Sequence, residues 1–321
     1  MRAVVVPRHG GPEVLTVEDR PAPEPGPGEI LVETAAAGVN FIDTYQRAGV
    51  YPLATPFVPG LEGAGRVVAV ARDVTGVAVG DRVAWASALG SYAEQVVVRA
   101  AAAVPVPDGL ADDVAAGALL QGITAHYLTH STFPVSEGDT VLVHAAAGGV
   151  GLLLTQLVKQ RGGRVIATVS TDEKEALARG AGADEVLRYE GFSAAARDLT
   201  GGRGVDAVYD GVGQATFEGS LAALRPRGTM VLFGGASGQV PPFDPQRLNA
   251  LGSLYLTRPS IDAYVQTRDE LTWRTADILA GIAAGKLDLR IGGRYPLEEA
   301  GRAHDDLESR RTTGKLVLLT R

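Results

Sequence analysis

Ala145-Ala146-Ala147-Gly148-Gly149-Val150-Gly151 decides the fold of this chain, because it joins a strand-like segment to a helix-like one. Residues 138–144 form a short apolar run typical of a buried β-strand, and residues 152–159 carry apolar side chains at helical spacing. Glycines allow such a sharp turn and leave the first N–H groups and the positive end of the helix dipole facing outward. We therefore expect Gly148, Gly149, Val150 and Gly151 to bind the pyrophosphate of a dinucleotide.

The glycine pattern differs from the common Gly-x-Gly-x-x-Gly fingerprint at one position. The first glycine of that fingerprint would stand at residue 146, where this chain has Ala146. The alternative interpretation is a tight turn within an alanine-rich segment. The strand and helix patterns on either side favour the nucleotide site.

Composition and charge exclude several classes of protein. A chain of 321 residues with 45% hydrophobic and 21% charged residues is expected to form about two soluble domains, and no apolar run approaches the ~18 residues of a membrane span. The apolar start at residues 3–6 is too short for a secretory signal, so we expect a cytoplasmic protein. Cysteine is absent, which excludes disulfides and zinc sites built on thiolates. The net charge of −7 argues against a nucleic-acid partner.

The sequence pattern changes near residue 120 and divides the chain into two parts. Up to about residue 120, short β-rich runs alternate with proline and glycine, which predicts a compact, barrel-like β domain; the runs are 3–6, 30–35, 65–70, 81–86 and 92–98. The proline-rich residues 20–28 are expected to form an extended connector. From about 122 to 260, strands alternate with helices, as in a parallel sheet covered on both faces; the strands are 141–144, 165–169, 185–187, 207–209, 230–233 and 253–256. Six strands in this order predict a doubly wound α/β domain.

The C-terminal part is expected to return to the first domain. A helical run covers residues 268–284, a short helix is expected at 295–300, and a final strand covers 315–319. That last strand has no evident partner in the parallel sheet. We therefore predict a discontinuous β domain of residues 1–121 and 262–321 around a nucleotide domain of residues 122–261.

The residues after the second strand of the nucleotide domain indicate which cofactor binds. An acidic residue about 20 positions past the glycine turn usually holds a free ribose 2′-hydroxyl, but this chain has Ser170 there, followed by Lys174 one helical turn later. A hydroxyl and a cation suit a 2′-phosphate, so NADPH is favoured over NADH. The alternative is that Asp172 or Glu173 binds the ribose. Tyr189 either contacts the adenine or 2′-phosphate or packs in the interior.

Several segments together resemble one family. Residues 138–159, with their Gly-Asp and Ala-Ala-Gly-Gly-Val-Gly motifs, resemble the signature of the quinone oxidoreductase and zeta-crystallin group of the medium-chain dehydrogenase/reductase superfamily. The similarity extends along nearly the whole chain, through residues 40–45, 60–65, 209–213, 256–260 and 307–310.

This resemblance implies a GroES-like catalytic domain, a Rossmann domain, a homodimer and NADPH as hydride donor. Carried over residue by residue, the cofactor contacts would be Asn40, Phe41, Ile42, Asp43, Thr44, Tyr45, Tyr127, Gly149, Val150, Ser170, Lys174, Tyr189, Phe233, Gly234, Gly235, Ala236, Ser237, Leu256, Thr257, Arg258 and Arg310. One position departs from the family, since Gly211 stands where the group usually has serine. A hydroxyl contact to the cofactor is therefore expected to be lost.

The zinc alcohol dehydrogenases of the same superfamily look similar but place metal ligands at two positions that differ here. Their cysteine and histidine positions hold Asn40 and Leu61, neither of which replaces a thiolate or an imidazole as a zinc ligand. Among the five histidines only His126 and His130 have the i, i+4 spacing, and helix packing explains that pair better than a metal does. We expect no metal.

Without a metal to polarise a carbonyl, an acceptor that is already activated for hydride addition fits best. The first hypothesis is an NADPH-dependent quinone reductase, and the second is an enone or alkenal double-bond reductase. A third, of another class, is a non-catalytic NADPH-binding protein with a crystallin-like structural or RNA-binding role. Tyr45 and Tyr51 are expected to line the substrate pocket, with Asn40 and Asp43 nearby and no certain general acid. Tyr51 could instead only cap the domain.

Overall fold

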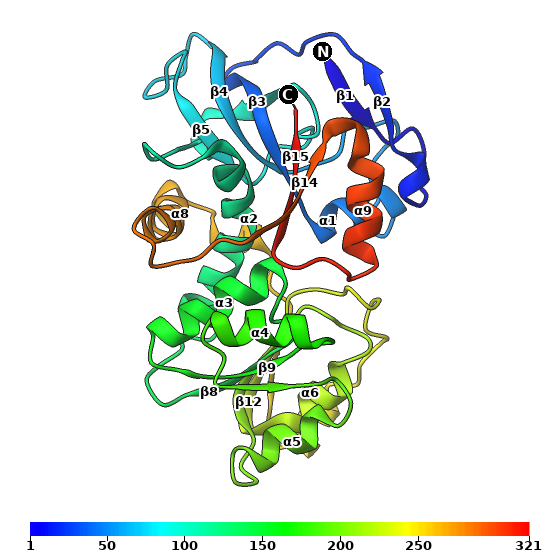
Figure 1. Ribbon diagram of the computed structural model, residues 1–321, viewed down its shortest axis with the longest axis vertical. Helices are drawn as coiled ribbons and strands as arrows, with labels where there is room; N and C mark the ends of the chain where they lie inside the picture. Colours follow the sequence, from blue (N-terminus) through cyan, green and yellow to red (C-terminus); the bar gives the residue numbers. More distant parts are fainter. Residues whose placement is uncertain (321) are drawn as a thin grey trace. The chain divides into compact units, whose positions relative to one another are not determined.

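The computed structural model describes residues 1–320, which divide into two compact units (Figure 1). The first unit contains Met1–Gln121 and the chain from Thr267 onward, and the second contains Gly122–Gln266. The second boundary therefore falls at 266 rather than at the expected 261. Residues 262–266 stay with the second unit because the Tyr264 ring stacks on Tyr127, with centroids 4.3 Å apart, and its hydroxyl accepts a hydrogen bond from Thr132.

The second unit contains one parallel sheet of six strands. These are β8 (Thr140–Val143), β9 (Arg164–Thr168), β10 (Glu185–Leu187), β11 (Val205–Asp210), β12 (Leu224–Leu232) and β13 (Tyr255–Thr257). Their order across the sheet is β10-β9-β8-β11-β12-β13, and every pairing between them is parallel. This is the doubly wound order, with the change of direction beside β8, so the predicted fold class is confirmed.

Helices cover both faces of this sheet. Figure 1 shows α3 (Gly149–Gln160) and α4 (Asp172–Gly180) against one face and α5 (Phe192–Asp198) and α6 (Phe217–Ala223) against the other. Strand residues such as Leu142, Val208 and Met230 are fully buried, and Phe192 and Phe217 pack onto them from the helices. Helices thus cover both faces of the hydrophobic sheet, and polar groups lie at the ends of its strands.

The first unit is built on a seven-stranded sheet. Its strands are β3 (Glu29–Val39), β4 (Glu62–Val70), β5 (Arg82–Trp85), β6 (Gln95–Arg99), β7 (Val104–Pro105), β14 (Ile291–Pro296) and β15 (Lys315–Leu319), and β1 (Arg2–Val5) pairs separately with β2 (Thr16–Asp19). The C-terminal strand β15 runs antiparallel to β3, with Leu316 opposite Val39. The predicted return of the chain to the first unit is therefore observed.

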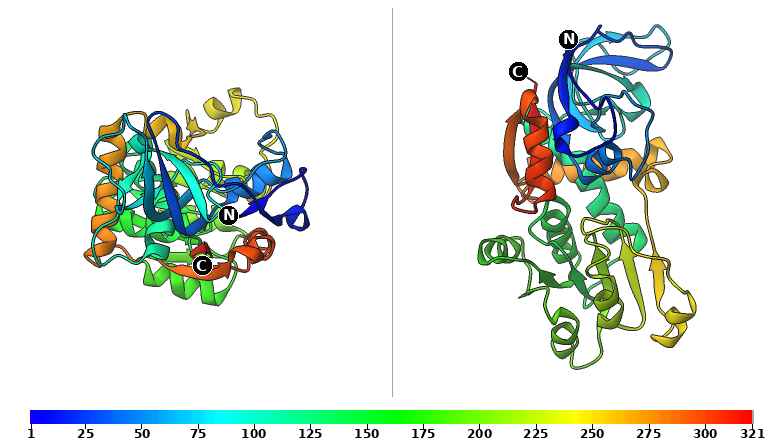
Figure 2. Two further views of the ribbon diagram at one scale, coloured as in Figure 1. Left: turned by 90° about the horizontal axis from the view of Figure 1, so that it is seen from above. Right: turned by 90° about the vertical axis from the view of Figure 1, so that its right-hand side faces the viewer.

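One expected element is wrong. Residues 295–300 were expected to be helical, but Tyr295 and Pro296 end strand β14, which pairs in parallel with β15. The helix begins later, with a short turn at Leu297–Glu299 that leads into α9 (Ala300–Glu308). Burial favours a strand over a helix at these two residues, because the Tyr295 ring packs in the apolar core that β15 and α9 share. Figure 2 shows α9, in red, alongside β14.

The remaining helices lie between strands along the chain. They are α1 (Phe41–Ala48), α2 (Asp112–Tyr127) with a π-helical turn at Leu128–Thr132, α7 (Gln246–Ala250) and α8 (Arg268–Ala283), and 3₁₀ turns occupy Pro12–Val14, Ala100–Ala102 and Ile261–Tyr264. The expected helix at 268–284 corresponds to α8. No described helix is long and apolar enough to span a bilayer.

Asp206 ties three neighbouring strands together at their starting ends. Its carboxylate accepts hydrogen bonds from the Thr140 N–H at the start of β8 and from two guanidinium groups, those of Arg203 and of Arg225 on β12. Burial acts to raise the pKa of this carboxyl, but the hydrogen bonds prevail and lower the pKa to about 2. The charged form of Asp206 is therefore the one that stabilises the sheet.

We expect Asp206→Asn to lower the free energy of unfolding by about 2 kcal/mol at pH 7, which is the worth of a pKa held near 2 rather than near 4. Because the folded-state pKa is the lower one, this contribution is complete above about pH 4 and is lost as the pH falls toward 2. Urea denaturation of both proteins at pH 7 and pH 3 measures the gap, with the exposed Glu190→Gln as control. A gap of equal size at both pH values would contradict the assignment.

Candidate active site

The glycine turn joins β8 to α3 in the way that a pyrophosphate site requires. Gly148 is the N-cap of α3, and the helix begins at Gly149. The turn contains one left-handed residue, Ala145 with φ 50°, whereas Ala146 is not among the described residues with positive φ. Ala146 is fully buried and its N–H donates to the Thr168 carbonyl. An alanine is therefore accommodated where the fingerprint has its first glycine.

Gly151 allows α3 to pack directly on the turn. A Cβ atom at this position would lie 2.7 Å from Ala146 Cα and closer still to the Ala145 carbonyl oxygen. Both are backbone atoms, which cannot move without displacing the turn. At Gly148 the same test gives 3.2 Å to the Ala145 oxygen, a tight contact that requires a shift of only a few tenths of an ångström. Gly151 is thus the glycine on which the geometry of the helix N-terminus depends.

A buried histidine supports the turn from behind. Each ring nitrogen of His144 meets a hydroxyl: Nδ1 lies 2.7 Å from Thr168 Oγ1 and Nε2 lies 2.9 Å from Ser220 Oγ. The Ser220 hydroxyl donates its hydrogen to Asp210 Oδ2, so His144 Nε2 must be the donor to Ser220. Burial lowers the pKa of His144 to about 4, although Asp210 acts to raise it. His144 is therefore neutral at pH 7, with its hydrogen on Nε2.

Asp210 organises the loop that follows β11. Its Oδ1 accepts the N–H groups of Val212 and Gly213, and its Oδ2 accepts the hydroxyls of Thr216 and Ser220. Four donors satisfy the buried carboxylate completely. The loop at residues 211–213 is thereby held at the carboxyl end of β11, where doubly wound sheets bind ligands.

The residues predicted to bind a 2′-phosphate lie together. Ser170 follows β9, and Lys174 Nζ on α4 lies 3.5 Å from Ser170 Oγ. Asp172, the alternative ribose ligand, forms an ion pair with Arg188 instead. The hydroxyl and the ammonium are both at the carboxyl end of β9, so this edge of the sheet presents a donor pair suited to an anion.

The aromatic candidates have partners inside the second unit. The Tyr189 hydroxyl accepts a hydrogen bond from the Ala145 N–H at 3.2 Å, which ties Tyr189 to the glycine turn. Its ring stacks on His144, with centroids 6.0 Å apart. Tyr127 is buried and stacks on Tyr264. Both tyrosines are thus fixed in orientation by the unit itself.

The loop after β12 interlocks with the loop after β11. A Cβ at Gly211 would lie 2.8 Å from the ring of Phe233, so the absence of the usual serine side chain gives this ring its space. The Ser237 hydroxyl donates to the Val212 carbonyl and accepts from the Ala215 N–H. Its hydrogen is therefore used within the protein. Of the other candidates, Gly234, Gly235 and Ala236 belong to this loop, Leu256 and Thr257 to β13, and Arg258 follows it.

In the first unit, Asn40 is the N-cap of α1 and is surrounded by buried polar groups. The Lys315 ammonium on β15 lies 2.6 Å from both Asn40 Oδ1 and Glu62 Oε2. Asn40 Nδ2 donates to Glu62 Oε2 and to the Gly38 carbonyl, while Glu62 Oε1 accepts the Leu120 N–H. Both amide hydrogens of Asn40 are thus engaged inside the unit, which makes Asn40 a residue that orients the start of α1.

This cluster does not fit a metal. The cation that contacts Asn40 and Glu62 is the Lys315 ammonium, and Leu61 contributes no ligand atom. No group of three or more histidine, aspartate or glutamate side chains that could hold a metal ion occurs among residues 1–320. A mechanism that uses zinc has no support from this donor set.

Helix α1 and the turn after it carry the two tyrosines predicted to form the substrate pocket. Tyr45 and Tyr51 meet edge to face, with ring centroids 5.5 Å apart, and Phe41 lies 6.2 Å from Tyr45. The N–H groups of Val50 and Tyr51 both donate to the Tyr45 carbonyl, so the turn after α1 brings the rings together. Ile42 is partly buried beside them, whereas the Thr44 hydroxyl turns back to the Phe41 carbonyl.

Two predicted residues lie apart from the aromatic group. Asp43 is completely buried on the inner face of α1, where its side chain accepts hydrogen bonds from the Asn40 N–H and the Tyr92 hydroxyl. Arg310 lies after α9 in left-handed backbone with φ 57°. Three residues of the buried networks were not predicted from the sequence: Lys315, Tyr92 and His304. A lysine at the head of the otherwise apolar strand Lys315–Leu319 was the one signal that could have indicated a buried ion pair.

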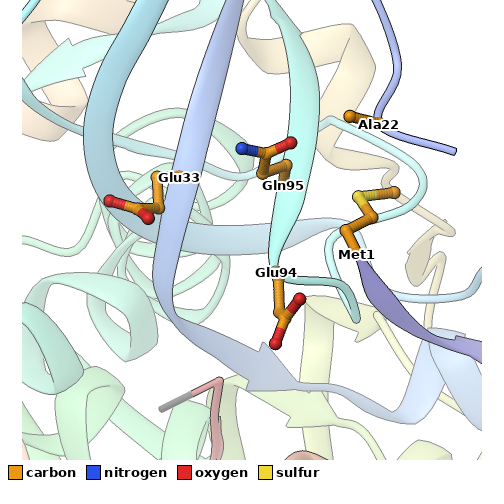
Figure 3. Close-up of a pocket in the computed structure, with 5 residues that line it drawn as sticks. All are labelled: Met1, Ala22, Glu33, Glu94 and Gln95. Atoms are coloured by element: carbon orange, nitrogen blue, oxygen red, sulfur yellow. The ribbon is translucent and has the colours of Figure 1, made fainter. Parts of the chain in front are cut away.

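A separate hollow of the first unit lies at the start of the chain (Figure 3). Met1, Ala22, Glu33, Glu94 and Gln95 line it, and Glu94 already accepts hydrogen bonds from the Arg2 backbone and side chain. Among the described residues that line it, none was predicted to bind cofactor or substrate. We assign it no role in the chemistry.

Comparison with known proteins identifies the family. Residues 26–108 match the alcohol dehydrogenase GroES-like domain and residues 149–270 match the zinc-binding dehydrogenase family. A quinone oxidoreductase of Pseudomonas aeruginosa is 45% identical over 97% of both chains. The chain belongs to the quinone oxidoreductase family. This family is part of the medium-chain dehydrogenase/reductase superfamily, as the sequence resemblance predicted.

Two further relatives of the family bear on its chemistry. The structure of a mycobacterial protein complexed with NADPH is 55% identical and has a TM-score of 0.98, with 99% of this chain and 100% of that chain covered. A 2-haloacrylate reductase of a Burkholderia species is 40% identical over 99% of this chain and 98% of its own. Quinone oxidoreductases and a 2-haloacrylate reductase therefore align with this chain over most of their length.

We expect Gly151→Ala to destabilise the protein by about 1–3 kcal/mol, because the added methyl group overlaps backbone atoms. Gly148→Ala, in the same turn, is the matched control and should cost less than half as much. Thermal unfolding without added nucleotide measures both, so that contacts with the cofactor do not enter. Equal destabilisation by the two substitutions would show that Gly151 has no special place in the packing.

Proposed function

We infer that this member of the quinone oxidoreductase family is an NADPH-dependent quinone reductase that works without a metal. One observation carries the inference: a quinone oxidoreductase is 45% identical to this chain over 97% of both chains. The Lys315 ammonium beside Asn40 and Glu62 supports the metal-free character.

The second unit is proposed to hold the nucleotide. Gly148, Gly149, Val150 and Gly151 would bind the pyrophosphate at the N-terminus of α3, where the helix dipole favours negative charge. Ser170 and Lys174 would bind the 2′-phosphate, and Tyr189 would fix the turn between these two groups. Within this unit, further contacts are proposed for Tyr127, the loop at 233–237 and residues 256–258. Bound NADPH would supply the hydride.

The first unit is proposed to bind the quinone and to act as the catalytic domain. Tyr45 and Tyr51 form an aromatic pair suited to stacking on a flat conjugated ring, and Phe41 extends it. A quinone that accepts a hydride becomes a hydroquinone anion, which takes one proton and leaves as hydroquinone. The aromatic pair would orient the ring and exclude water from the reacting face, which is how positioning accelerates a transfer.

An enone or alkenal reductase is the second candidate function. The 2-haloacrylate reductase that shares 40% of its residues with this chain favours it, since an acrylate also carries a double bond activated by conjugation. The same aromatic pocket would then hold the conjugated alkene, with hydride added to carbon rather than to a quinone.

The sheet edge at β13 is proposed as the contact of a homodimer. β13 ends the sheet order of the second unit, and its Tyr255 side chain is 63% exposed. Leu251 is also exposed nearby in the chain. An open strand edge with apolar side chains readily pairs with a second copy. We place the dimer in the cytoplasm, in keeping with a sequence without cysteine.

A panel of acceptors tests the function. We expect NADPH oxidation with a benzoquinone and a naphthoquinone in buffer containing a chelator, slower turnover of enones, and none of simple alcohols or aldehydes. Lys174→Gln should reduce the preference for NADPH over NADH about tenfold, since a charge-assisted hydrogen bond is worth about 1.5–3 kcal/mol. Turnover of enones with no quinone activity would favour the second candidate, and an unchanged cofactor preference would exclude Lys174 from the phosphate site.

Light scattering tests the dimer. The wild-type protein should have twice the chain mass of 33.3 kDa, and Tyr255→Lys should shift it toward the monomer because charge opposes strand pairing. Val79→Lys, at a position that is 65% exposed in the first unit, is the matched control and should leave the mass unchanged. A monomeric wild type, or a variant that stays dimeric, would exclude the β13 edge.

A further inference from the structure

Four buried side chains form a closed ring with helix α1. Asp43 and Arg47 lie one helical turn apart on the same face of α1, and they are joined through Tyr92 and His304. Arg47 Nη1 lies 3.0 Å from His304 Nδ1, His304 Nε2 lies 3.1 Å from the Tyr92 hydroxyl, and that hydroxyl lies 2.9 Å from Asp43 Oδ2. All four side chains are at most 2% exposed.

The direction of every hydrogen bond in the ring is determined. A guanidinium can only donate, so His304 Nδ1 accepts and the imidazole hydrogen is on Nε2. That hydrogen goes to the Tyr92 oxygen, which leaves the Tyr92 hydrogen for Asp43. Burial and Arg47 lower the pKa of His304 to about 3, so the His304 imidazole is neutral at pH 7. The chain of donors therefore runs from Arg47 through His304 and Tyr92 and ends on Asp43.

Asp43 is the group of the ring that can change charge near neutral pH. Its Oδ2 accepts two hydrogen bonds, from Tyr92 and from the Asn40 N–H, whereas its buried Oδ1 has no hydrogen-bond partner among residues 1–320. A bare anionic oxygen in the interior is costly, and a proton on it removes the charge. Burial raises the pKa of Asp43 to about 7, against the effect of its hydrogen bonds.

The charges around Asp43 act on it in opposite directions. Lys315 on β15 lowers the pKa of Asp43, and Glu62 on β4 raises it. Arg47 is bonded to the neutral His304 on α9 rather than to Asp43, and its Nη2 is paired with Glu308 of the same helix. Each side of Asp43 therefore has a group whose removal shifts the proton in a known direction.

We propose that Asp43 is a positioning residue that carries an exchangeable proton on Oδ1, and that loss of this proton loosens the hold of the ring on α1 and so on Tyr45. The proposal deepens the proposed function, because it assumes that Tyr45 binds the quinone. Protonated Asp43 keeps the ring dry and α1 fixed. When Asp43 is deprotonated, its Oδ1 requires a hydrogen-bond donor. Entry of water or movement of neighbouring groups supplies that donor, and the pair Tyr45 and Tyr51 loses its orientation. Binding of the quinone then weakens as the pH rises through neutrality.

The pH dependence of kcat/KM for the quinone tests this proposal. For wild type we expect a fall of about tenfold between pH 6 and pH 8, as for one group that titrates near 7 and must hold its proton. Asp43→Asn offers an amide where the protonated carboxyl would be, so its profile should be flat over this range. A variant that keeps the wild-type inflection would overturn the proposal.

Two neighbouring substitutions give a signature that a purely structural role would not produce. Tyr92→Phe removes a hydrogen bond that lowers the pKa of Asp43, so the inflection should move to higher pH. Glu62→Gln removes a charge that raises it, so the inflection should move to lower pH. Shifts in the same direction, or none, contradict the assignment, and these variants decide the matter if Asp43→Asn folds poorly.

Unfolding separates this proposal from the proposed function. Because the folded-state pKa of Asp43 is raised, wild type should lose stability relative to Asp43→Asn as the pH rises from about 4 to 7, and not above. Urea denaturation of the full chain measures this without any substrate. The expected slope without quinone turnover would refute the reductase function alone, whereas turnover without the slope would refute the buried proton.

Discussion

A carboxylate that is buried away from water needs hydrogen-bond donors for its oxygens, and this constraint shapes both units of the protein. Asp210 receives four donors and thereby fixes the loop that follows β11. Glu62 receives a backbone N–H, an amide and an ammonium, and thereby fixes Asn40 at the start of α1. Asp43 receives two donors on one oxygen and none on the other. Asp43 thus differs from the other two in one oxygen that has no donor, and burial raises its pKa to about 7.

Two of the buried histidines, His144 and His304, position a carboxylate in the same way. His144 donates to Ser220, which donates to Asp210, and His304 donates to Tyr92, which donates to Asp43. In each case a neutral imidazole fixes the direction of a hydroxyl, and the hydroxyl fixes a carboxylate. One network lies behind the glycine turn and the other beneath α1. Each unit therefore contains its own network of buried polar groups, made by the protein alone.

Local patterns predicted the parts of the protein that depend on local backbone. The glycine turn, the six parallel strands and the pair Ser170 and Lys174 follow from spacing along the sequence, because a strand, a turn and a helix are determined by neighbouring residues. The assignment of Tyr295 and Pro296 to a helix failed because their strand exists only through pairing with β15. Lys315 and Glu62 are 253 positions apart, so no local pattern relates them.

The Lys315 ammonium has a consequence for how the protein is made. A dehydrogenase that depends on a metal must find one after synthesis, and its activity follows the supply. In this chain the cation beside Asn40 and Glu62 is part of the polypeptide and arrives when β15 joins the sheet. Because Lys315 and Glu62 are 253 positions apart, the cluster forms only when β15 has joined the sheet that contains β4. Removing the Lys315 ammonium would leave the Glu62 carboxylate buried without its cation, so the order of the strands in the sheet and the charge balance of the interior depend on each other.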